Sequence, residues 1–458
     1  MPREDEMATP HGLVRGFGVF KFDLNIGQTC EFLHPADFIS DCDLRNIAML
    51  CFPDSQSTAS KSSTFDCLYY FIVTITPKDP GTNSLRANVY SCYVYFRQVE
   101  DHACSRGFYQ KSFVLFSKYP AICEPLLAIA RSVGNKYFLG EPEGCGVEVL
   151  IDSLNDLRKL SIESFNPSSG LLSVQEPVRN SNRQRASVSI GNSSIQVSDL
   201  VYSFLDGLWH VWECIMVGLP VLVYTSGPDI SCHVVLELSR LVSPFPIESL
   251  LYPYLSIFDP EFKRLSTHVP KGCIVGVTSP MAFERLCNSF SIVICVETCT
   301  ENLSSFTKVC QSLYGSMWLA ESITSVSSGT RDRVTSIMRN WSLVSFPESY
   351  RLVISPEVVA VRSKLILSNI NDDAEFSKSI NRGIIANYFK SLTRDFLIPF
   401  LNHIGSGSLF SPSAFLASIS PVGFFATSLL PPEKLSKLYS QHIQTNRFHD
   451  WLIKSSQN

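Results

Sequence analysis

The stretch Leu208–Tyr224 reads LWHVWECIMVGLPVLVY and contains both kinds of element from which we predict the fold. Its apolar residues recur at helical spacing from Leu208 to Leu219, which predicts a helix with one continuous apolar face. Gly218 and Pro220 end that helix, because glycine favours a helix C-terminus and proline cannot continue a helix. The residues Val221–Tyr224 then form an apolar run typical of a strand that is buried on both faces.

The same alternation continues further along the chain. Apolar residues return to helical spacing over Ile230–Val242, and buried strands are predicted at Cys273–Val277 and Ser291–Val296. Between these two strands, Ser279 suits a helix N-cap and Pro280 the first helical position. Strand–helix–strand alternation predicts a parallel sheet with helices on both of its faces.

The N-terminal part of the chain has a different pattern. Cys67–Thr76 is rich in β-branched and aromatic residues, and Cys92–Val99 and Phe108–Ser117 alternate in character. The polar segment Glu100–Gly107 joins the last two, so we predict a hairpin with a long loop. Leu126–Val133 has helical character, and together these elements predict an antiparallel sheet accompanied by helices.

The C-terminal part is predicted to be helical. Apolar residues share one face over Ile384–Phe396, and Pro399 is expected to bend or end this helix. Gly405–Ser413 is predicted to be a flexible loop, and Lys434–Trp451 a final helical stretch.

The predicted fold class is therefore α/β, or α+β overall. Residues 162–198 are dominated by Ser, Asn, Gln and Arg, a composition typical of a linker. The predicted parts are an antiparallel sheet module at 14–161, this polar linker at 162–198, a three-layer α/β segment at 199–300, and a helical segment at 301–458 that packs on the α/β segment.

The composition argues against several classes of protein. Hydrophobic residues make up 45% of the 458 residues, and the net charge is −4, so a large core is expected and a nucleic-acid partner is not. The 15 cysteines are scattered singly, which favours buried thiols over metal ligands or a disulfide-linked partner. Met1–Gly12 lacks the features of a signal peptide, and no apolar run reaches membrane-span length, so we expect a cytoplasmic protein.

No catalytic motif stands out in the sequence. There is no Gly-rich loop ending in Gly-Lys-Ser/Thr, no nucleophile elbow and no His-Glu-x-x-His. His210 and the neighbouring acids Asp259 and Glu261 are interpreted as structural. We therefore expect no catalytic residue, no cofactor and no metal, and we favour a protein that works by binding.

The chain resembles the DENN-domain family over most of its length and in the same order. The longest similar run is Tyr93–Val99 followed by Arg106–Ser112. Further similar stretches are Asp23–Gln28, Phe52–Ser55, Leu208–Pro220, Pro253–Tyr254, Phe258–Lys263, Gly276–Pro280, Tyr388–Phe389, Phe396–Pro399 and Phe448–Trp451.

This resemblance implies both a fold and an activity. It implies a longin-like N-terminal module followed by an α/β module built from the central and downstream segments. It also implies a guanine-nucleotide exchange factor for a Rab-type GTPase in vesicle trafficking. Any association with membranes, including endosomal ones, would then be indirect, through the Rab.

Five residues are candidate contacts to that GTPase. Phe52 and Asp54 belong to a Phe-Pro-Asp-Ser turn that exposes an acid after an apolar segment. Arg97 and Gln98 are polar residues that close an apolar strand. Asp229 follows the strand Val221–Tyr224, at the edge where open α/β sheets bind their ligands, although a role at the start of the next helix also explains it.

Three alternatives remain open. A GTPase-activating protein would supply an arginine finger, for which Arg97 or Arg106 is a candidate. A non-catalytic scaffold would bind a GTP-loaded Rab without promoting exchange. A nucleotide-binding enzyme would fit the α/β layer, but the chain lacks the glycine loop that such an enzyme needs.

Overall fold

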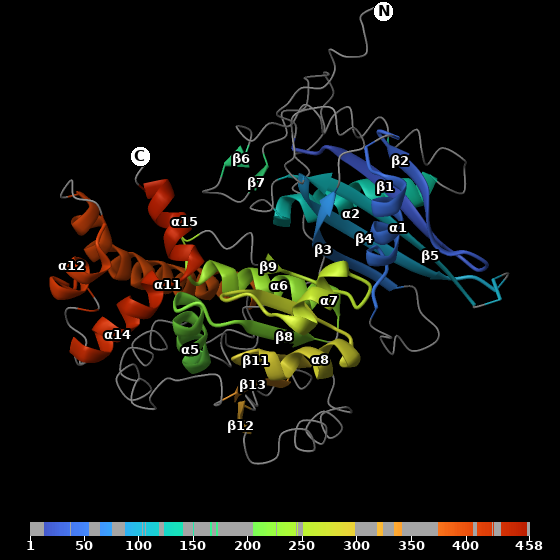
Figure 1. Cartoon of the computed structure of the whole chain (residues 1–458). Coiled ribbons are helices and arrows are strands. Elements are labelled where there is room, and N and C mark those ends of the chain that lie inside the picture. The colour runs from blue at the N-terminus through green and yellow to red at the C-terminus, as the bar shows by residue number, and fades with distance from the viewer. Residues whose placement is uncertain are drawn as a thin grey trace, which may run out of the picture. The chain divides into compact units, whose positions relative to one another are not determined.

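The computed structural model divides the chain into two compact units, Met1–Ser194 (unit 1) and Ile195–Asn458 (unit 2), each with its own sheet (Figure 1). It describes residues 13–36, 38–54, 65–75, 88–102, 104–105, 107–118, 123–140, 150, 165–166, 171–172, 205–225, 227–243, 245, 251–297, 318–323, 334–340, 374–405, 410–423, 425 and 432–455.

Unit 1 is built on a five-stranded antiparallel sheet with the strand order β2-β1-β5-β4-β3. The predicted hairpin is confirmed, since β4 and β5 are antiparallel neighbours. The bounds of the elements are β1 (Gly16–Asp23), β2 (Gly27–His34), α1 (Asp41–Leu50), β3 (Phe65–Ile75), β4 (Asn88–Glu100), β5 (Phe108–Ser117) and α2 (Cys123–Gly140).

The two helices of unit 1 cover opposite faces of this sheet. At the end of α1, the Cys51 carbonyl accepts a hydrogen bond from Ser112 Oγ at 2.5 Å. On the other face, α2 lies so close to the sheet that a Cβ at Gly134 would stand 2.5 Å from the ring of Tyr95. The sheet is therefore buried on both sides, which explains why Tyr93, Tyr95 and their neighbours are apolar or aromatic in both alternating positions.

Within the predicted linker, β6 (Phe165–Asn166) and β7 (Leu171–Leu172) form a short antiparallel pair. The rest of the predicted linker lies outside the described residues.

Unit 2 contains a six-stranded sheet with the order β12-β13-β11-β8-β10-β9. The expected parallel core is confirmed, because β8 is parallel to both β10 and β11, and β9 is parallel to β10. The bounds are α5 (Leu205–Met216), β8 (Val221–Thr225), α6 (Pro228–Arg240), β9 (Leu251–Tyr252), α7 (Pro260–Thr267), β10 (Ile274–Val277), α8 (Pro280–Leu286), η6 (Cys287–Ser289), β11 (Ile292–Glu297), β12 (Trp318–Ile323) and β13 (Val334–Asn340).

The sheet continues past residue 300, where only helices were expected. The strands β12 and β13 are antiparallel to each other, and β13 is antiparallel to β11. Their sequences mix serine, threonine and charged residues with apolar ones, so neither strand has the apolar run by which β8 and β10 were found.

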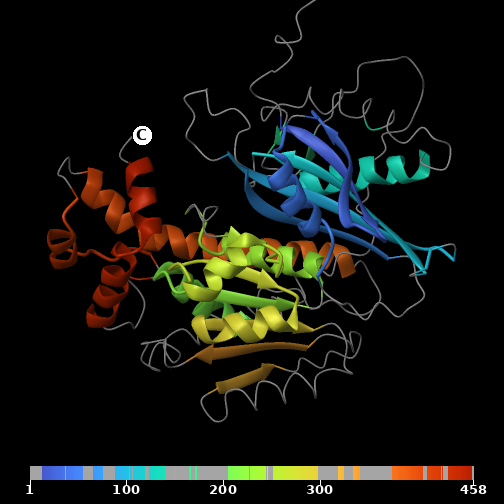
Figure 2. The ribbon, with the colours of Figure 1, turned by 45° about the vertical axis from the view of Figure 1, so that its right-hand side comes forward.

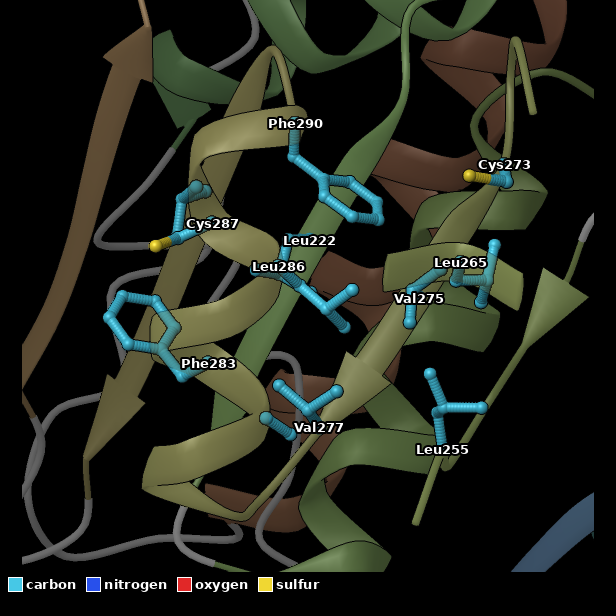
Figure 3. Close-up of a cluster of buried hydrophobic side chains, with 12 residues drawn as sticks. Leu222, Leu255, Leu265, Cys273, Val275, Val277, Phe283, Leu286, Cys287 and Phe290 are labelled. Atoms are coloured by element: carbon cyan, nitrogen blue, oxygen red, sulfur yellow. The ribbon is translucent and has the colours of Figure 1, made fainter. Parts of the chain in front are cut away.

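The helices α7 and α8 pack on one face of the parallel strands. Twelve buried side chains fill the space between them and the sheet, including Leu222, Val275 and Val293 from the strands and Phe283 and Leu286 from α8 (Figure 3). On the other face α6 approaches β10 very closely, because a Cβ at Gly276 would stand 2.0 Å from Ser231 Oγ.

The C-terminal helices differ from the prediction in two places. Of the two expected effects of Pro399, bending or ending the helix, the ending does not occur, because α11 (Ala374–Gly405) continues past it. On either side of this proline, Phe396 stacks on Tyr439 at 4.4 Å and Phe400 on Phe415 at 4.3 Å. The helix α12 (Pro412–Ala417) begins inside the predicted loop. The predicted final stretch consists of two helices, α14 (Pro432–Ile443) and α15 (Asn446–Ser455).

Two buried side chains attach these helices to the end of α5. Arg447 donates to the carbonyls of Ile215 and, at 3.0 Å, of Gly272. His442 Nδ1 lies 2.6 Å from the Met216 carbonyl. The last carbonyls of α5 are thus satisfied, and a positive charge stands at the negative end of the helix dipole. Burial lowers the pKa of Arg447 to about 10.

Candidate protein-docking site

Four of the five predicted site residues gather at one end of the unit 1 sheet. At this end β1 turns into β2, β4 turns into β5, and the chain leaves α1, so we call it the hairpin end. The register places Lys21 opposite Lys111, Lys111 opposite Arg97, and Arg97 opposite Asp66. Paired residues of an antiparallel sheet share a face, so one row of charged side chains crosses four strands here.

Arg97 is held within this row. Its guanidinium donates to both carboxylate oxygens of Asp66, at 2.9 and 3.1 Å, and its Cζ lies 5.3 Å from the centroid of the Phe138 ring of α2. The Tyr95 hydroxyl lies 2.7 Å from side-chain oxygens of Asp66 and Asn135. Burial, with the Asp66 carboxylate, raises the pKa of Tyr95 and keeps its proton in place.

Lys111 is a member of this row that sequence reasoning missed. Its side chain is buried, its Nζ stands 2.9 Å from Glu31 Oε2, and it donates to the Tyr137 hydroxyl at 3.1 Å. A lysine in a strand ordinarily indicates an exposed position, and only the folded structure brings Glu31 of β2 and Tyr137 of α2 beside it.

Gln98 and Phe52 lie on the opposite face of the same end. Gln98 Oε1 accepts from Gln110 Nε2 at 2.7 Å, directly across the β4–β5 pair. Phe52 is buried, with its ring edge-on to Phe22 and Phe96 at centroid distances of 6.2 and 6.0 Å. Its ring is therefore part of the core, and it places the half-buried Asp54 two residues later.

Asp229 lies in unit 2, just after β8 and in the first turn of α6. Gly227 is the N-cap and provides no side chain, while a carboxylate in the first turn is favourable to the helix dipole. The Asp229 carboxylate also reaches back over the cap, since a Cβ at Gly227 would stand 2.6 Å from its Oδ1. Its role at the start of the helix is thus visible, and it also lies at the carboxyl edge of the parallel sheet.

The two acids interpreted as structural do have structural partners. Asp259 is the N-cap of α7 and accepts from the Glu261 backbone N–H at 2.9 Å, and burial raises its pKa to about 6. Glu261 pairs with Arg264 at 2.5 Å. The side chain of His210 and the whole of Arg106 lie outside the described residues.

The described part of the chain contains neither a metal-binding cluster nor a helix that could span a membrane. Within it, no group of three or more His, Cys, Asp or Glu side chains is arranged to hold a metal ion. The cysteines it contains are free thiols and most are buried, and burial raises the pKa of Cys273 to about 12. No helix there combines the length and apolar character that a membrane span requires.

Comparison with known proteins gives three informative similarities. The chain is 29% identical to Protein DENND6A of Gallus gallus over 307 residues, covering 58% of this chain and 51% of that protein. It is 29% identical to Protein DENND6B of Mus musculus over 304 residues, with the same coverage. It is 26% identical to the Protein DENND6 homolog of Dictyostelium discoideum over 466 residues, covering 84% of this chain and 60% of that one.

The resemblance to DENN-domain proteins is thereby confirmed, with DENND6 proteins as the similar members. The chain spans about half the length of the animal relatives that it matches. No protein-family model matches it.

Proposed function

We propose that this DENND6-like chain is a guanine-nucleotide exchange factor, which promotes GDP release and GTP loading on a Rab-type small GTPase in vesicle trafficking. The observation that carries the proposal is the similarity to DENND6 proteins, because DENN-domain proteins generally act on Rab GTPases in this way. The division of the chain into two compact units is consistent with it.

An exchange factor works through coupled binding equilibria. It binds the nucleotide-free GTPase more tightly than the loaded one, so by linkage it weakens nucleotide binding by the same factor. If the GTPase held its nucleotide at picomolar strength, about 16 kcal/mol would oppose release. Contacts made only with the opened GTPase offset part of this free energy, and excess GTP then refills the site by mass action.

The contacts that we propose come from both units. Asp54 and Gln98 lie at the hairpin end of unit 1, Arg97 lies at the same end with its side chain on the face opposite to Gln98, and Asp229 lies at the carboxyl edge of the sheet in unit 2. Phe52 contributes by positioning Asp54. The chain would reach endosomal membranes through its GTPase.

A GTPase-activating role with Arg97 as the arginine finger is less well supported, whereas Arg106, the other candidate, lies outside the described residues. An arginine finger must extend into the active site of the GTPase, but Arg97 is bound to both oxygens of Asp66 and packs over Phe138. The scaffold role shares the same docking residues and differs in its preference for the GTP-loaded form.

The test is release of a fluorescent GDP analogue from a panel of purified Rab-type GTPases, with and without the protein and in excess GTP. We expect faster release from one or two of them, reduced at least tenfold by Asp54→Ala combined with Arg97→Ala. The control is Glu284→Ala with Arg285→Ala, which removes the same two charges from the exposed face of α8. Faster hydrolysis, or binding of the GTP-loaded form without exchange, would contradict the proposal.

A further inference from the structure

The geometry of the hairpin end points to a docking face for a folded protein whose own surface is apolar and bordered by basic side chains. Its anchors are Leu24 and Ile26 in the β1–β2 turn. Met49 at the end of α1 and Leu139 at the end of α2 lie at the same end of the unit, on opposite faces of the sheet. This inference rests on the proposed function in one respect, since we take the partner to be the GTPase.

Exposed apolar side chains are concentrated at this end of unit 1. Among its described residues, five large hydrophobic side chains are exposed: Ile26 at 78%, Leu139 at 76%, Val89 at 54%, Leu24 at 49% and Met49 at 42%. All but Val89 belong to the β1–β2 turn or to the last turn of a helix that ends near it. Clustered exposure of this kind marks interaction surfaces, whereas single exposed residues are ordinary.

The ends of α1 and α2 are fixed close to the same end of the sheet. After Met49, the Leu50 carbonyl accepts from the Tyr69 hydroxyl at 3.1 Å and the next carbonyl accepts from Ser112. Before Leu139, the hydroxyl of Tyr137 accepts from Lys111. In Figures 1 and 2 the β1–β2 turn and the ends of β4 and β5 project from the same end of the sheet, as the pairing of β1 with β5 requires.

The β1–β2 turn has its shape without any partner. Asp23 Oδ1 accepts from the backbone N–H groups of Asn25 at 2.8 Å and Ile26 at 3.1 Å. Gly27 closes the turn at φ +88°, a conformation that favours glycine. Because the turn is already ordered, binding through Leu24 and Ile26 loses little conformational entropy, which is the advantage of a preorganised anchor.

The charges around these anchors select the kind of partner. The two innermost cations of the charged row are matched, Arg97 by Asp66 and Lys111 by Glu31. The carboxylates of Asp23, Asp54, Glu100 and Asp101 also stand at this end, against the cations of Lys21 and Lys136.

The border of the apolar face is therefore acidic. An anionic lipid surface would be repelled by it, whereas a protein patch with an apolar centre and a basic border would be complementary. Interfaces between proteins commonly have this apolar centre and polar rim.

The experiment compares the wild-type chain, the double variant Leu24→Ser with Ile26→Ser, and the control Val89→Ser. Val89 is similarly exposed but lies at the other end of β4, about 30 Å from Gln98 at the rise of an extended strand. Each protein is tested for exchange on purified Rab-type GTPases and for binding to their nucleotide-free and GTP-loaded forms. Each is also tested for sedimentation with neutral vesicles and with vesicles that contain roughly 30 mol% anionic lipid.

We expect the double variant to weaken GTPase binding and exchange at least tenfold while its thermal unfolding and the control stay as in the wild type. Exchange that persists unchanged in the double variant would overturn the docking face and leave the proposed function standing. Binding that needs Leu24 and Ile26 but brings no exchange would support the docking face and refute exchange. No binding to any GTPase, or vesicle binding that requires the two residues, would overturn the docking face.

Discussion

Arg97 shows how one side chain can be identified from sequence while its environment is not. Its position at the polar end of an apolar strand was readable, and it was a candidate both for docking and for an arginine finger. The structure places it between the Asp66 carboxylate and the Phe138 ring, residues 31 positions before it and 41 after it in the chain. The register of β3 on β4 creates that environment, so its partners were not readable from the neighbouring sequence.

We predict that Arg97→Ala lowers the free energy of unfolding by about 1–2 kcal/mol, from a partly exposed ion pair and the lost packing on Phe138. Arg97→Lys should lose less, because it keeps the charge but not the two-pronged hydrogen bond. Urea unfolding of Arg97→Ala, Asp66→Asn and the double variant gives the coupling between the two. Additive effects would show that the pair contributes nothing to stability.

At the scale of elements, the contact between α6 and β10 depends on a single glycine. The strand was predicted from its apolar run, yet nothing in that run indicates that a helix passes directly over Gly276. In the structure, Ser231 Oγ donates to the Pro253 carbonyl at 2.8 Å, and both atoms lie where a Cβ on Gly276 would be.

Gly276→Ala should therefore destabilise unit 2 by about 3 kcal/mol, because the Pro253 carbonyl belongs to the backbone and has little room to move. Gly383→Ala on α11 is the matched control, since a Cβ there meets nothing within 4 Å. The control should gain about 0.5–1 kcal/mol from the better helix propensity of alanine. Denaturant midpoints measure both, and equal effects would mean that α6 does not lie as close to β10 as the structure has it.

At the scale of the whole molecule, stability depends on pH through two buried groups of unit 2. Burial lowers the pKa of His442 to about 3, from an ordinary value of 6.5. Burial raises the pKa of Asp259 to about 6, from 3.8. Below pH 6.5 the unfolded chain takes up the His442 proton that the folded chain refuses, so this group makes stability fall as pH falls. Asp259 acts in the opposite direction, because the folded chain takes up its proton first.

When the pH falls from 7 to 5, titration of His442 should lower the free energy of unfolding by about 2 kcal/mol, and titration of Asp259 should raise it by about 1 kcal/mol. His442→Asn keeps a donor for the Met216 carbonyl and should lose less stability on acidification than the wild type. Asp259→Asn keeps the helix cap and should lose more. Unfolding by urea at the two pH values measures the differences, and identical pH dependence in all three proteins would contradict this assignment.

The sequence by itself determined many of the local elements, the absence of familiar catalytic motifs and the likeness to DENN-domain proteins, because these are properties of neighbouring residues. Helical spacing placed the apolar face of α5, and apolar runs placed β8, β10 and β11. Only the tertiary structure decided that Lys111 faces Glu31, that Arg447 closes the end of α5, and that Leu24 and Ile26 stand exposed beside a charged row. The reason is physical: strand register and helix packing bring together residues that are far apart in the chain, and their burial and charge balance exist only once that pairing is made.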